Sequence, residues 1–60
     1  MRREDRMRIR DDMDLIRHAL TGINKALRDD SLGSIQGAAV RIKDLADDIF
    51  TATLEENKEE

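Results

Sequence analysis

A chain of 60 residues has room for one domain and lies near the lower limit of length at which a protein folds alone. It has no cysteine, one histidine and a single aromatic residue, so disulfide bridges are excluded and a structural zinc site is implausible. Charged residues make up 42% of the chain, and the net charge is −3. Small folds that lack disulfides and metals are usually stabilised by oligomerisation, so we expect this chain to need a partner.

The first predicted element is a helix over about residues 4–28. Its large apolar residues recur at steps of four and three, a spacing that puts them on one helix face. They are Ile9, Met13, Ile16, Leu20, Ile23 and Leu27.

A turn is predicted at residues 29–31, where Asp30 or Ser31 can cap the next helix by accepting a backbone N–H. The second helix is predicted over about residues 32–54, followed by a frayed acidic tail at 55–60. A connection this short makes the two helices antiparallel neighbours. Residues 1–28 carry a net charge of +3 and residues 29–60 carry −6, so a basic helix lies beside an acidic one.

The second helix carries smaller apolar residues at the same spacing as the first. Small and large side chains that alternate in this way form layers that interdigitate across a bundle. We therefore predict an all-α fold, an antiparallel helical hairpin that forms a homodimeric four-helix bundle. The residues predicted to form the dimer core are Met13, Ile16, Leu20, Ile23, Leu27, Ile35, Ala39, Ile42, Ala46 and Ile49.

The segment from about Leu15 to Leu54 resembles the Rop family of plasmid copy-number proteins, which are homodimers of helical hairpins. The resemblance is greatest in Asp44-Leu45-Ala46-Asp47-Asp48-Ile49-Phe50, and Ile16-Arg17 and Leu27 also match. It implies the hairpin fold and the small/large core register of the second helix.

Rop-like proteins bind paired RNA loops through lysine, asparagine, phenylalanine and glutamine on the exposed face of their first helix. This chain has Glu4, Asp11, Leu15, Ala19 and Ala26 at the matching positions, and the neighbouring arginine at position 17 is retained. The resemblance therefore implies the fold and does not imply RNA binding.

Basic residues on an adjoining stripe give an independent reason to consider RNA. They are Arg3, Arg10 and Arg17, which recur every seven residues, with Lys25 and Arg28 continuing the line. In a dimer the stripe is duplicated and could follow phosphate groups. The alternative is a solvated face whose charges pair with carboxylates one turn away on the same helix.

A second strip, made of Leu15, Ala19, Gly22 and Ala26, also recurs at helical spacing. Small residues at this spacing allow another helix to approach closely. One interpretation is a docking groove for a protein partner. The other is that the strip flanks the bundle core and is partly covered by the neighbouring helix.

No nucleophile–base pair, metal-ligand spacing or phosphate loop is recognisable, so we expect neither an enzyme nor a bound cofactor or metal. No apolar run is long enough to span a membrane, and the first residues lack the apolar core of a signal peptide, which makes the cytoplasm the default location. The expected function is that of a regulatory interaction module that binds itself and a protein partner, with structured-RNA binding as the alternative.

Overall fold

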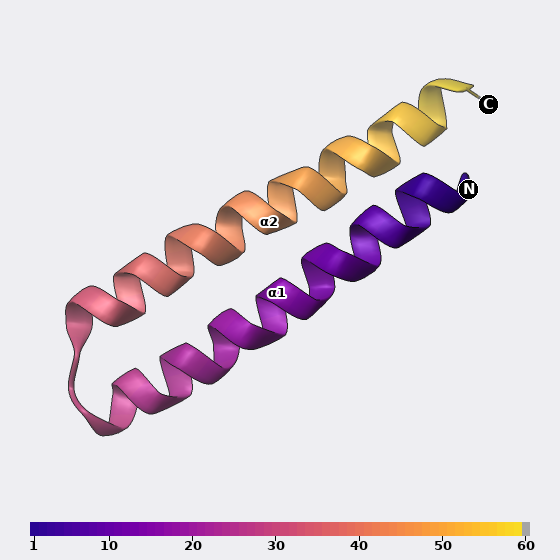
Figure 1. Cartoon of the computed structure of the whole chain (residues 1–60). Coiled ribbons are helices and arrows are strands. Elements are labelled where there is room, and N and C mark those ends of the chain that lie inside the picture. Colours follow the sequence, from indigo (N-terminus) through magenta and orange to yellow (C-terminus); the bar gives the residue numbers. More distant parts are fainter. Residues whose placement is uncertain (60) are drawn as a thin grey trace.

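The computed structural model describes residues 1–59 and the side chains of residues 1–55. Two helices, α1 (Arg3–Arg28) and α2 (Leu32–Glu59), lie side by side and run antiparallel (Figure 1). The predicted all-α hairpin is therefore confirmed. The molecule is a rod with principal extents of 47 × 15 × 9 Å, and no helix in its described part is long and apolar enough to span a membrane.

The turn between the helices is closed by backbone hydrogen bonds. Asp30 has a φ of 55°, in the left-handed region that glycine usually occupies at this position of a helix end. Aspartate tolerates this conformation better than most residues. The left-handed conformation of Asp30 lets the Ser31 N–H donate to the Ala26 carbonyl at 2.9 Å, which satisfies an otherwise free acceptor of α1. The Ser31 hydroxyl donates to Oγ of Ser34 at 2.9 Å, at the start of α2.

The second helix is longer than predicted, because it continues to Glu59 instead of ending near Leu54. No glycine or proline follows Leu54, and glutamate and lysine are good helix formers. The segment predicted as a frayed tail is thus helical through Glu59, and residue 60 lies outside the described residues.

The contact between the helices is built from small side chains. Ala19 and Ala26 of α1 are 8% and 4% exposed, and Ala52 of α2 is fully buried. Asp12, one heptad before Ala19, is the other buried residue of the described part, and no large side chain there is fully buried. Within the described residues, one hairpin therefore holds its helices together along a line of alanines, without a core of large side chains.

The residues predicted to form the core are not buried in a single hairpin. Leu20 is 52% exposed and Leu27 is 61% exposed, and Ala39 and Ala46 are exposed as well. The predicted isoleucines at positions 16, 23, 35, 42 and 49 are half-buried. One residue corresponds to about 100° of helix rotation. The α1 line that faces α2 runs through Ala19, so the line through Leu20 points away from α2.

Candidate functional site

One side of the hairpin carries a continuous apolar surface, which we call the open face: Met13, Leu20, Leu27, Ala39 and Ala46. On α1, each open-face residue comes one position after a residue of the line that contacts α2. On α2, each open-face residue likewise comes one position after a residue of the line that contacts α1. Because the helices are antiparallel, equal rotations bring both stripes to the same side of the rod. The half-buried isoleucines lie between the two stripes and form the floor of this face.

The hairpin exposes more surface than its mass explains. Its accessible surface is 5014 Å², whereas a compact monomer of this mass exposes about 4,000 Å². The radius of gyration is 14.1 Å, against about 10 Å for a compact domain of this length. The excess area is close to the ~800 Å² that each partner buries in a standard protein interface.

The arginines of the predicted basic stripe lie on the outer edge of the open face. Arg10 and Arg17 come three residues before Met13 and Leu20 of the open face, on the flank of α1 away from α2. Arg3 and Arg10 line a surface hollow of about 470 Å³ together with Arg6 and Met7.

Not all of the predicted basic residues share this edge. Lys25 lines a different hollow, beside the turn, together with Gly22 and Asp29. Arg17 lies 4.0 Å from Asp14 with both side chains mostly exposed, a pair of the kind that contributes little to stability. The edge that the arginines do share is therefore formed by Arg3, Arg10 and Arg17.

The strip of small residues predicted as a docking groove is not free. Ala19 and Ala26 are covered by α2, whereas Leu15 is 46% exposed and Gly22 is exposed. In one hairpin the small side chains of Ala19 and Ala26 serve the close approach of α2, which leaves Leu15 and Gly22 as the accessible part of the predicted groove. The interpretation that the neighbouring helix covers part of this strip agrees with the structure.

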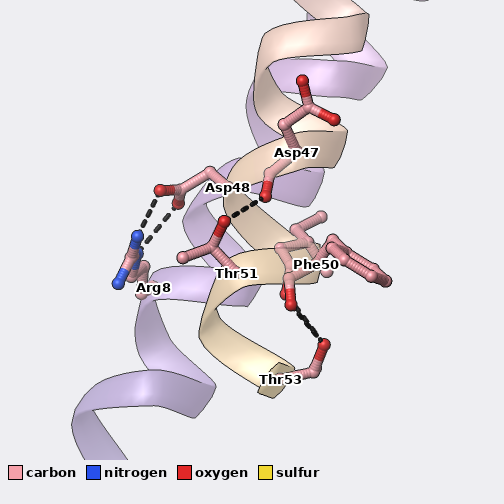
Figure 2. A network of polar contacts seen from close by, with 7 residues as sticks. Arg8, Asp47, Asp48, Phe50, Thr51 and Thr53 are labelled. Atoms are coloured by element: carbon pink, nitrogen blue, oxygen red, sulfur yellow. Dashed lines mark hydrogen bonds and ion pairs between the residues drawn. The ribbon is translucent and has the colours of Figure 1, made fainter. Parts of the chain in front are cut away.

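A polar cluster crosses from α1 to α2 on the side opposite the open face. Arg8 of α1 extends toward Asp48 of α2, and its Nε donates to Oδ2 of Asp48 at 2.9 Å (Figure 2). The Nη2 atom of Arg8 contacts the other carboxylate oxygen, so the pair is bidentate. In the same view Thr51 and Thr53 donate to backbone carbonyls of their own helix, at Asp47 and Phe50.

Asp12 interacts with both members of this ion pair and is 8% exposed. Its buried Oδ2 atom has no hydrogen-bond partner. The hydrogen bond that a protonated Asp12 can donate to the Asp48 carboxylate, followed by burial, raises the pKa of Asp12 above its usual value of 3.8. The hydrogen bonds from Arg8 lower the pKa of Asp48 to about 2 and raise the pKa of Arg8.

Sequence reasoning did not identify this cluster. The available signal was that Asp12 precedes Ala19 and Ala26 by one and two heptads, so it belongs to the line that faces α2. The basic and acidic charges of the two helices predicted cross-helix attraction in general. They did not single out Arg8 and Asp48, because that choice depends on the alignment of the two helices along the rod.

The chain matches no family model, no curated protein and no solved structure. The comparisons therefore add no family to the antiparallel two-helix hairpin that the structure shows.

Proposed function

We propose that the chain works without catalysis, as a homodimeric helical bundle that acts as a regulatory interaction module and binds a protein partner. The open face carries this proposal, because it is an apolar surface that one hairpin leaves in contact with water. The molecule proposed to cover the open face is a second copy of the same chain. The same face on two copies can meet around a two-fold axis and bury the half-buried isoleucines of both.

The area of the open face supports this arrangement. The surface in excess of a compact monomer is close to what each partner of a standard interface buries. A hairpin whose buried apolar side chains, among those the structure describes, are alanines gains little from burial, and larger side chains would be covered only on association. The Rop-like register of α2 fits the same architecture.

Sedimentation equilibrium at micromolar concentration tests this proposal. We expect a mass of about twice the 6.9 kDa of the chain. Thermal unfolding of such a dimer depends on protein concentration, because association stabilises the folded form by mass action. A cooperatively folded species with the mass of one chain would overturn the proposal.

Structured RNA is the alternative ligand, and the arginine edge formed by Arg3, Arg10 and Arg17 favours it. These side chains border the open face, so a dimer carries two such edges. Guanidinium groups that contact phosphates release counterions, which makes binding strongly salt-dependent.

Replacing both Arg10 and Arg17 by glutamine tests the RNA alternative. If the edge binds phosphates, the affinity for a structured RNA should fall, and the slope of log K against log salt should decrease by about 1 for each arginine. Arg41→Gln on α2 is the matched control and should leave the slope unchanged. Equal effects of the edge and control variants, or no effect of either, would exclude this edge as an RNA-binding surface.

A further inference from the structure

The cluster of Asp12, Asp48 and Arg8 contains more negative than positive charge. Two nitrogens of the Arg8 guanidinium contact the Asp48 carboxylate, and the buried Oδ2 of Asp12 has no hydrogen-bond partner. Among the residues whose side chains the structure describes, the other charged groups that act on the cluster are Asp11 on α1 and Glu55 on α2, and both are acidic. With every carboxyl group ionised, one carboxylate is held against α2 without a partner of its own, which is unfavourable at a buried site.

One proton resolves this imbalance. An ionised carboxylate only accepts hydrogen bonds, whereas a protonated carboxyl group also donates one. A proton on Asp12 therefore lets its O–H donate to Asp48 while Asp48 stays ionised and paired with Arg8. The two carboxyl groups are then joined by a hydrogen bond between the helices, in place of the electrostatic repulsion between two carboxylates.

We propose that Asp12, Asp48 and Arg8 form a proton-controlled clasp between α1 and α2, which closes when the two carboxyl groups share a proton and loosens when that proton leaves. The clasp joins α1 and α2 in the half of the rod away from the turn. It lies opposite the open face, so it acts on the contact within one hairpin and lies outside the proposed dimer interface.

The direction of the pH dependence follows from linkage. The pKa of Asp12 is higher in the folded chain than its usual value of 3.8, so the folded state keeps this proton while the unfolded state loses it. The contribution of Asp12 to stability therefore falls as the pH rises from 3.8 to the pKa that Asp12 has in the folded chain, and it is constant at higher pH. Asp48 acts in the opposite sense, because its contribution is lost as the pH falls from 3.8 toward about 2. Together the two groups stabilise the fold most at a pH around 3.8.

Asp12→Asn tests the clasp, because the amide is neutral at every pH and can donate an N–H to Asp48. At pH 7 and fixed protein concentration, we expect its unfolding midpoint, followed by circular dichroism, to rise by roughly 4–8 °C above that of the wild type. The wild type should lose stability relative to this variant as the pH is raised from 4 to 7.

Two further variants separate the clasp from a general charge effect. Asp14→Asn removes the same charge at an exposed position of α1 outside the cluster and should leave the pH profile like that of the wild type. Asp48→Asn removes the partner of Arg8 and should lower the midpoint at pH 7. In the wild type, the Asp12 carboxyl group, followed by NMR through the chemical shift of its carboxyl carbon, should lose its proton at a pH above 3.8. An ordinary or lowered titration of Asp12, or an Asp12→Asn variant no more stable at pH 7 than Asp14→Asn, would overturn the proposal.

Discussion

Replacing Leu20 by aspartate should leave the chain monomeric and largely unfolded at micromolar concentration. Leu20 lies in the middle of α1 and is 52% exposed in one hairpin, so a single chain could accommodate the charge. In a dimer closed through the open face, however, each copy would place an unpaired carboxylate in the core. Burying such a charge costs about 3–5 kcal/mol, which corresponds to a rise of about 100-fold or more in the dissociation constant.

The measurements are sedimentation equilibrium for mass and circular dichroism for helix content. Thr21→Asp is the matched control, because it adds the same charge at the exposed neighbour of Leu20, turned away from the open face. The control should keep the mass of a dimer. If Leu20→Asp has the same mass and helix content as the control, the open face is not the dimer interface.

The second large effect is expected from Ala19→Glu, which should unfold the hairpin. Ala19 is 8% exposed because α2 lies directly over it. A glutamate there must either bury a charge between the helices or push them apart, and both remove the close contact along the line of alanines. We expect a loss of at least about 3 kcal/mol, which is a large part of the stability available to so small a fold.

Leu15→Glu is the control for Ala19→Glu, because Leu15 belongs to the same strip and is 46% exposed. It should change the midpoint of thermal or urea unfolding little. The two interpretations of the strip differ here. A free docking groove predicts that both variants fold normally, whereas coverage by α2 predicts that only the variant at Ala19 unfolds.

The sequence was sufficient to predict the two helices, the turn and their antiparallel arrangement. Periodic apolar residues define a helix face, and a three-residue connection leaves only neighbouring antiparallel helices. The end of α2 was placed five residues too early, because an acidic segment without an apolar partner was interpreted as frayed. Helix formers continue a helix until a residue stops it, and none does so after Leu54.

The sequence was less informative about which line of each helix faces which neighbour. Leu20 and Ala19 are adjacent and both belong to the broad apolar face of α1, yet one is exposed and the other is buried by α2. Periodicity alone cannot assign them, because the assignment depends on how the helices are rotated in the pair. The clasp was missed for a related reason. Arg8 and Asp48 are 40 residues apart in the chain, and only the packed hairpin brings them together.

The rod shape of the hairpin affects how assembly would be observed in solution. A second copy placed on the open face would add to the thin dimension of the rod, 9 Å, and little to its length of 47 Å. End-over-end tumbling of a rod depends mainly on its length, and the backbone N–H bonds of both helices lie nearly along that length. Amide relaxation rates would therefore respond weakly to pairing, whereas rotation about the long axis and the scattering cross-section would change strongly.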